Sequence, residues 1–202
     1  MTGAGDTARD ALAYLGRRYS FGPKYLGLPA PSQAELQAAA ELALRAPDHG
    51  QLRPFRFVRI DDAQRGRLAA LFAADAERRG HAPDEIERAR ERAHNGPVLV
   101  ALVARVRPDV ADVPEPEQWM CVGGALMNFL NALHLMGYGA KVLSGASVRD
   151  PGIQAAFCRE GETLATWIVA GTPSRHAHPK PGPQGGPALD DWDDPGAAQP
   201  RS

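Results

Sequence analysis

The feature that most constrains this fold is the uninterrupted apolar run Pro97–Ala104, which contains no charged side chain. A run of this length without alternating polar residues predicts a strand that is covered on both faces. The next apolar segment, Trp119–Met136, predicts a buried core helix, because it carries Asn128, Asn131 and His134 and is shorter than a membrane span. A doubly covered strand and a core helix favour a three-layer α/β or α+β domain over a helical bundle or a β-sandwich.

Capping and turn residues divide the rest of the domain into helices and strands. Asp6 is the expected N-cap of the first helix, and Ser32 with Glu35 has the pattern of a capping box at the second. The predicted helices cover residues 6–18, 32–45, 61–80, 83–95, 118–136 and 150–157, and the predicted strands cover residues 55–60, 97–104, 140–143 and 163–170.

The composition changes after Pro173, where the chain becomes rich in Pro, Gly and His. Such a segment has too few apolar residues to bury a core of its own. We therefore expect one folded domain over residues 1–173. A tail over residues 174–202 is expected to be either disordered or laid as an arm on a partner surface.

The charge balance and the cysteine content exclude several classes of protein. With 23 basic and 24 acidic residues, the net charge is −1, which gives no electrostatic support for nucleic-acid binding. Cys121 and Cys158 are too few for a disulfide framework or a zinc site, so we expect both to be reduced and packed. The N-terminus lacks the basic and apolar regions of a signal peptide, so a cytoplasmic protein without a membrane partner is expected.

No familiar catalytic or metal-binding motif is present in the sequence. Gly-rich dinucleotide and phosphate loops, Gly-x-Ser-x-Gly and paired-histidine metal motifs are all absent. Carboxylate pairs occur only at a helix cap or in the tail, at Asp61-Asp62, Asp190-Asp191 and Asp193-Asp194. His176 and His178 would offer a metal only two ligands. The sequence therefore assigns no catalytic side chain and no metal ligand.

The most informative polar feature is the corner Arg45–His49, which is followed by Arg53-Pro54 at the start of a predicted strand. Two arginines and one histidine fall within nine residues, beside two prolines that stiffen the backbone. A rigid cationic corner of this kind is suited to binding a phosphate or another anion.

Other polar groups are open to two interpretations. Arg17-Arg18 ends the first predicted helix, where it would either bind an anion or complement the helix dipole. Asn128, Asn131 and His134 recur along one side of the core helix, where hydrogen bonding to neighbouring backbone is the simpler interpretation. Ser144-Gly145 follows a short predicted strand and forms a candidate binding loop.

Taken in order and spacing, these segments resemble the FMN-dependent nitroreductase family, in particular its short single-domain NAD(P)H nitroreductases. The matching segments are Arg17–Tyr19, Arg45–His49, Arg53–Val58, Gly137–Gly139, Ser144-Gly145 and Gly171–Pro173. The resemblance covers about residues 8–173. No single motif is diagnostic, but the ordered set is specific.

The resemblance implies a three-layer α+β fold with a central, mainly antiparallel sheet flanked by helices. It also implies a homodimer with two FMN sites at the subunit interface. Arg17, Arg18 and Tyr19 match the segment that holds the FMN phosphate and ribityl chain in the family. Arg45 and His49 match residues that contact FMN, partly from the other subunit.

A loop near the reactive edge of the flavin completes the implied cofactor site. Its matching residues here are Val142, Leu143, Ser144 and Gly145. The chain departs from the family pattern at Tyr19, which replaces a serine, and at Phe55, which replaces a tryptophan. Leu143 replaces an arginine, and Arg53 replaces a glutamine, so Arg53 is a candidate for supplying the charge that Leu143 lacks.

The resemblance therefore implies an enzyme that passes hydride from NADH or NADPH through FMN to a nitroaromatic or quinone-type acceptor in a ping-pong cycle. Leu143 and Tyr19 keep open an alternative, a flavin-binding family member with little nicotinamide turnover that serves in flavin storage, sensing or cleavage. A third reading is a structural interaction protein that binds through its tail.

Overall fold

The computed structural model describes residues 4–174, 188–189 and 192. Its helices are α1 (Ala4–Gly16), α2 (Gln33–Ala43), α3 (Asp62–Arg78), α4 (Pro83–Glu91), α5 (Glu115–Leu135) and α6 (Pro151–Phe157). Its strands are β1 (Leu26–Gly27), β2 (Phe55–Ile60), β3 (Val98–Ala104), β4 (Gly139–Leu143) and β5 (Thr163–Pro173). Short 3₁₀ helices are η1 (Pro23–Tyr25), η2 (His49–Gln51), η3 (Arg92–His94) and η4 (Ala146–Arg149).

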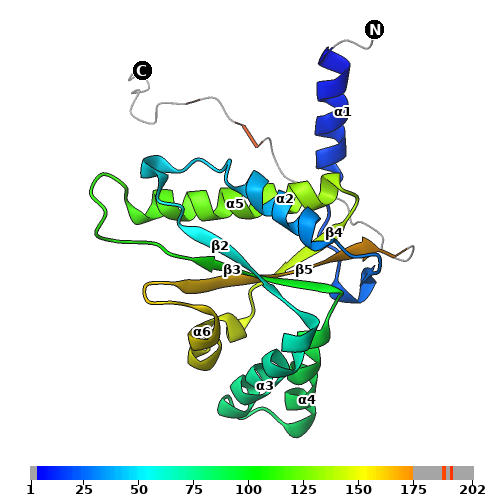
Figure 1. Cartoon of the computed structure of the whole chain (residues 1–202), viewed down its shortest axis with the longest axis vertical. Helices are drawn as coiled ribbons and strands as arrows, with labels where there is room; N and C mark the ends of the chain where they lie inside the picture. The colour runs from blue at the N-terminus through cyan, green and yellow to red at the C-terminus, as the bar shows by residue number, and fades with distance from the viewer. Residues whose placement is uncertain (1–3, 175–187, 190–191, 193–202) are drawn as a thin grey trace, which may run out of the picture.

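The five strands form one sheet in the middle of the domain (Figure 1). The order along the sheet is β1-β5-β3-β2, and β4 also pairs with β5. Every pairing between named strands is antiparallel, and a single isolated parallel bridge joins Ser20 to Ala140. The predicted α+β fold with a mainly antiparallel sheet is therefore confirmed.

Helices cover both faces of the sheet, which gives the three predicted layers (Figure 1). α2 and α5 pack on one face, where Val100 and Leu102 join their core. α3, α4 and α6 lie on the other face, where Leu99 and Val103 point. All seven residues of β3 are buried because alternate side chains enter different cores. The apolar run thus forms the doubly covered strand that its composition predicts.

Local sequence signals fix several helix ends. Ser32 is the N-cap of α2: its hydroxyl accepts from the Glu35 N–H at 3.2 Å, and Glu35 Oε2 accepts from the Ser32 N–H at 2.8 Å. The predicted N-cap Asp6 is wrong, since α1 begins at Ala4 and Asp6 lies within it. β1 was not expected, because its two residues carry no strand pattern and exist only through pairing with the end of β5.

The expectation that the segment 119–136 is buried holds for only part of α5. Phe129 and Leu133 are almost fully buried, but Trp119, Met120 and Met127 are exposed in the single chain. The helix therefore has one face in the core and a second apolar face at the surface. No helix among the described residues is long and apolar enough to cross a membrane.

The predicted tail falls almost entirely outside the described residues. β5 ends at Pro173, next to the predicted boundary, and the Ser174 N–H donates to the Tyr25 carbonyl at 2.8 Å. Whether residues after Ser174 form an arm stays a prediction.

Candidate functional site

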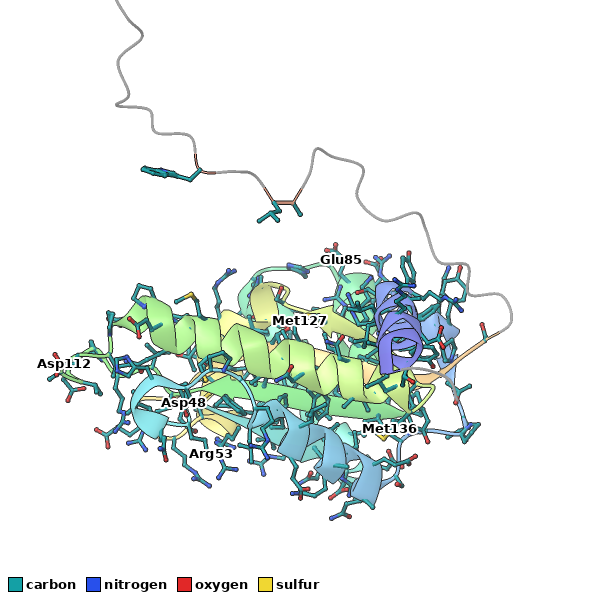
Figure 2. The ribbon with its side chains drawn as sticks, turned by 90° about the horizontal axis from the view of Figure 1, so that it is seen from above. Asp48, Arg53, Glu85, Asp112, Met127 and Met136 are labelled. Carbon is teal, nitrogen blue, oxygen red and sulfur yellow. The ribbon has the colours of Figure 1, made fainter. Side chains whose placement is uncertain are left out.

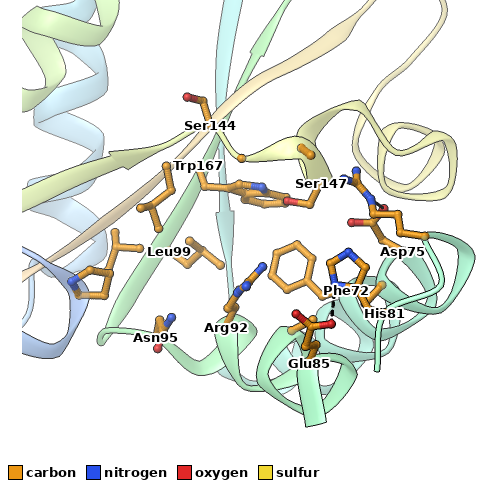
Figure 3. Close-up of a pocket in the computed structure, with 18 of the residues that line it drawn as sticks. Phe72, Asp75, His81, Glu85, Arg92, Asn95, Leu99, Ser144, Ser147 and Trp167 are labelled. Carbon is orange, nitrogen blue, oxygen red and sulfur yellow. Dashed lines mark hydrogen bonds and ion pairs between the residues drawn. The ribbon is translucent and has the colours of Figure 1, made fainter. Parts of the chain in front are cut away.

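A cavity of about 650 Å³ lies between the loop after β4 and the helices α3 and α4 (Figure 3). Val142, Leu143, Ser144 and Gly145, all of them predicted site residues, line one wall. Phe72 of α3 and Trp167 of β5 form an aromatic part of the lining, with ring centroids 5.6 Å apart at an interplanar angle of 87°. The cavity therefore combines aromatic and aliphatic surface with an exposed turn of backbone.

The loop after β4 carries unused hydrogen-bond donors. β4 pairs with β5 as far as Leu143 opposite Trp167, and the chain then leaves the sheet at Ser144. Within residues 4–174, the backbone N–H groups of Ser144 and Gly145 donate no hydrogen bond to another protein group. A cofactor or substrate oxygen in the cavity would find donors here.

A buried carboxylate holds the far side of this loop. Asp150 caps α6, with its Oδ1 accepting from the Ile153 N–H at 2.9 Å, and its Oδ2 accepts from Arg78 of α3 at 2.6 Å. Burial acts to raise the pKa of the Asp150 carboxyl, but these hydrogen bonds and the Arg78 charge outweigh burial and lower it. Asp150 therefore ties η4 and α6 to α3, the two sides between which the cavity lies.

The cationic corner is built around a different carboxylate. Asp48 accepts from the backbone N–H of Leu52 at 3.0 Å and of Arg53 at 2.8 Å. These bonds hold a tight turn in which Gln51 and Arg53 both have positive φ. The corner also packs closely on α5, because a Cβ built at Gly124 would lie 3.3 Å from the Ala46 Cβ.

The charged side chains of the corner face outward. His49 Nδ1 lies 2.9 Å from Glu117 Oε2 at the start of α5, and both side chains are exposed. Arg45 is also exposed and has no ion-pair partner within the described part of the chain. Figure 2 shows Asp48 and Arg53 beside α5, on the layer that contains α2.

The segment Arg17–Tyr19 follows α1 and leads into the parallel bridge between Ser20 and Ala140. The segment thus lies near the start of β4, while Val142 and Leu143 lie at its end. Tyr19 packs its ring edge-on against Phe21, with centroids 5.2 Å apart. The chain therefore uses the aromatic ring at this position for packing.

The predicted site residues thus fall into two regions of the subunit. Val142–Gly145 line the cavity on the α3 and α4 side of the sheet, whereas Arg45 and His49 lie on the α2 and α5 side. Arg17–Tyr19 and Arg53 are not among the residues that line the cavity. Within one subunit, Arg53 does not replace the charge missing at Leu143.

Sequence reasoning missed the half of the cavity that α3, α4 and η3 provide. Arg79, His81, Glu85 and Arg92 face it, together with the aromatic residues of its lining (Figure 3). Their only sequence signal is a highly charged helix, which is also typical of a solvated surface. Nothing in that pattern indicates that α4 and η3 lie opposite the loop after β4.

Two simpler interpretations are supported. His134 Nε2 lies 2.9 Å from the Tyr14 carbonyl, and Asn128 Nδ2 lies 3.5 Å from the Leu42 carbonyl, so two of the three polar groups of α5 bond to backbone. The Asn131 side chain makes no such bond within the described part of the chain. Cys121 and Cys158 are free thiols, as expected. Burial, with a smaller contribution from the Asp48 charge, raises the pKa of Cys121 to about 11, so this thiol is protonated at neutral pH. Among the described residues, no group of three or more metal-binding side chains occurs.

Comparisons of this chain with known proteins all identify the same family. Residues 16–171 match the family model described as "Nitroreductase family". A Haemophilus influenzae protein named "Putative NAD(P)H nitroreductase" is 32% identical over 164 residues, which cover 81% of this chain and 88% of that protein. Escherichia coli K12 "Putative NAD(P)H nitroreductase YdjA" is 32% identical over 169 residues, which cover 83% of this chain and 91% of that protein.

Solved structures agree on the fold. The FMN and NADPH-dependent nitroreductase NfnB from Sphigopyxis sp. strain HMH superposes with a TM-score of 0.68 at 19% identity, covering 91% of this chain and 99% of that one. A nitroreductase in complex with FMN from Desulfovibrio desulfuricans gives a TM-score of 0.62 at 20% identity, covering 86% of this chain and 91% of that one. From the match of fold and sequence over most of its length, the chain belongs to the nitroreductase family.

Proposed function

We propose that the protein is an FMN-dependent oxidoreductase that takes reducing equivalents from NADH or NADPH and reduces nitroaromatic or quinone-type acceptors in a ping-pong cycle. Bound FMN would supply the hydride chemistry, and the protein would bind, orient and shield the reactants. Family membership supports this proposal, as do the names of its relatives, which are called NAD(P)H nitroreductases.

The observation that carries the proposal is the loop after β4 at the cavity. Its unused backbone N–H groups at Ser144 and Gly145 offer donors for the carbonyl and nitrogen acceptors of a flavin ring. Val142 and Leu143 of the same loop add apolar contact, so this wall of the cavity fits a flavin in chemistry. The facing Phe72 and Trp167 offer aromatic surface for the ring of an acceptor.

The remaining predicted residues would hold the anionic end of the cofactor. In the proposal, Arg17 and Arg18 bind the phosphate and ribityl chain, together with the backbone of Tyr19. Arg45 and His49 lie on the opposite layer of the same subunit, so they would act on the cofactor bound by a second subunit. This division of the site requires a homodimer.

The surface of α5 and its neighbours supports a homodimer. Exposed large apolar side chains gather on the α1, α2 and α5 side, namely Leu12, Tyr14, Leu42, Leu44, Trp119, Met120, Met127 and Leu135. Figure 2 shows Met127 on α5, the same helix that carries Glu117 beside the cationic corner. A second copy packed on this face would bury apolar surface and bring its own corner toward the first subunit.

The purified protein tests this proposal directly. We expect a yellow protein with about one FMN per subunit and a mass of two subunits in light scattering at micromolar concentration, as an obligate homodimer would show. A colourless protein that takes up no added FMN would contradict the proposal. A yellow monomer would contradict only the shared site.

Leu143 favours one alternative function. Its side chain packs against the apolar core on the α3 side, so the loop after β4 contributes no charge to the cavity. A flavoprotein of this kind would bind FMN for storage, sensing or cleavage with little nicotinamide turnover. Anaerobic mixing with NADH and with NADPH separates the two: bleaching of the flavin supports the oxidoreductase, and a persistent yellow colour supports the alternative.

A further inference from the structure

The charged side chains of the cavity are not equivalent. Arg79, the C-cap of α3, has its Nε 2.6 Å from Asp75 Oδ1, so this cation is neutralised by a carboxylate in the last turn of α3. Glu85 Oε2 accepts from the Ala82 N–H at 3.1 Å at the start of α4 and lies 3.9 Å from His81 Nδ1. Each of these groups already has a partner inside the protein.

Arg92 differs from them. It lies in η3, lines the same cavity, and makes no ion pair or side-chain hydrogen bond with any residue in the described part of the chain. Figure 3 shows its guanidinium pointing from η3 toward Leu99 and Trp167, with the Phe72 ring between it and the pair His81 and Glu85. The residue is exposed, so its charge carries no burial cost at the cavity mouth.

The surface around Arg92 is apolar and partly aromatic. Leu99 and Trp167 are buried within the sheet, and Phe72 and Ala89 approach from α3 and α4. A ligand that matches this lining has a planar apolar body and one anionic group at its edge. Arginine binds carboxylates through two parallel hydrogen bonds, which fixes the orientation of such a ligand.

We propose that Arg92 selects electron acceptors that carry a carboxylate on an aromatic ring, with the ring in the cavity and the carboxylate paired to the Arg92 guanidinium. The inference rests on the proposed function, because it places the acceptor beside the loop that would contact FMN. It assigns Arg92 to substrate specificity rather than to the cofactor.

Binding of two ligands of the same shape tests this assignment. 4-Nitrobenzoate and 4-nitrobenzamide differ chiefly in charge, and their dissociation constants can be measured by calorimetry on the oxidised protein. We expect the wild-type protein to prefer the carboxylate. Arg92→Gln should weaken 4-nitrobenzoate binding by about 10- to 100-fold, the range for a hydrogen bond to a charged group. It should leave 4-nitrobenzamide binding and FMN content unchanged.

Arg88→Gln is the matched control, since Arg88 lies one turn earlier, pairs with Asp84 and does not line the cavity. Equal loss of 4-nitrobenzoate binding in both variants, or no loss in Arg92→Gln, would overturn the inference while an FMN-loaded protein leaves the proposed function standing. Loss of FMN from Arg92→Gln would also overturn it, because Arg92 would then hold the cofactor. A protein without FMN would end the proposed function, whichever ligand it binds.

Discussion

The two regions that the sequence marks as a cofactor site differ in how they are built and where they face. The cavity beside Val142–Gly145 is concave, has an aromatic lining and lies on the α3 and α4 side of the sheet. The corner at Arg45–His49 is exposed and cationic, and it lies against α5 on the other side. One region has room for a ring but few unpaired charges, and the other has exposed cationic side chains that do not line this cavity.

In the proposed arrangement, neither region is a complete site by itself. A phosphorylated aromatic cofactor needs both an apolar slot and fixed cations. Since the two regions of one subunit lie on different layers, a dimer is the simplest way to join them, with the corner of one subunit beside the cavity of the other. Variants of each region, alone and combined in one dimer, separate this arrangement from two independent sites.

The largest effect is expected from Arg45→Ala. If the corner holds an anionic part of FMN, this change should weaken FMN binding by about 1.5–3 kcal/mol, the value for a hydrogen bond to a charged group. Equilibrium titration of the apoprotein with FMN measures it. Arg67→Ala is a matched control, because Arg67 is an exposed arginine of α3 outside both the cavity and the corner. Equal FMN affinity of the wild type, Arg45→Ala and Arg67→Ala would show that Arg45 does not bind FMN.

A heterodimer sharpens this result, because it reports which subunit supplies the corner. Gly145→Leu should block the cavity without strain, since Gly145 has φ −64° and open space at the Cβ position. Co-expression of Arg45→Ala and Gly145→Leu subunits with two different tags yields pure heterodimers. A site shared across the interface leaves roughly one intact site in each heterodimer, so about half of the FMN is retained. If each site lies within one subunit, both sites of the heterodimer carry a defect and neither is intact.

A smaller effect, confined to the cavity, is expected from Asp150→Ala. Loss of the N-cap of α6 alone should lower the free energy of unfolding by about 0.5–2 kcal/mol. Loss of the contact with Arg78 adds to this and should speed hydrogen exchange in η4 and α6, but not at the corner. Asp84→Ala is the control, because its pair with Arg88 is exposed and contributes little. Equal destabilisation in both variants would contradict this role for Asp150.

The same carboxylate gives a pH dependence with a definite sign. The pKa of Asp150 is lower in the folded protein than its usual 3.8, so its contribution to stability is complete above that pH. It is lost as the pH falls below 3.8, when the unfolded chain takes up the proton first. Urea unfolding of the wild type and of Asp150→Ala across this range should therefore converge at low pH.

The smallest effect is expected at the corner from Asp48→Asn. The amide keeps one acceptor oxygen, so one of the two bonds to the Leu52 and Arg53 N–H groups is lost, at a cost of about 0.5–1.5 kcal/mol. Hydrogen exchange should become faster at these two amides, and FMN binding should weaken less than in Arg45→Ala. Faster exchange in η4 instead would contradict the separation of the two regions.

The sequence alone determined most helices and strands, because these have local causes; β1 is an exception, since it exists only through pairing with β5. The unbroken apolar run of β3 requires two covering layers, and Ser32 and Glu35 start α2 through bonds within four residues. Its order of short motifs also determined the family, which rests on residues spread from Arg17 to Pro173. The predicted start of α1 was wrong, because aspartate occurs both at helix N-caps and in the first turn of a helix, and Asp6 lies inside α1.

Only the tertiary structure decided what surrounds each motif. The sequence gives no sign that η3, far from β4 along the chain, brings Arg92 to face the loop at Ser144, or that Arg53 lies away from that loop. Sheet pairing and helix packing fix these distances, and both depend on contacts between residues distant in sequence. The sequence therefore identifies the residue types of a candidate site, whereas the fold decides which other residues lie beside them.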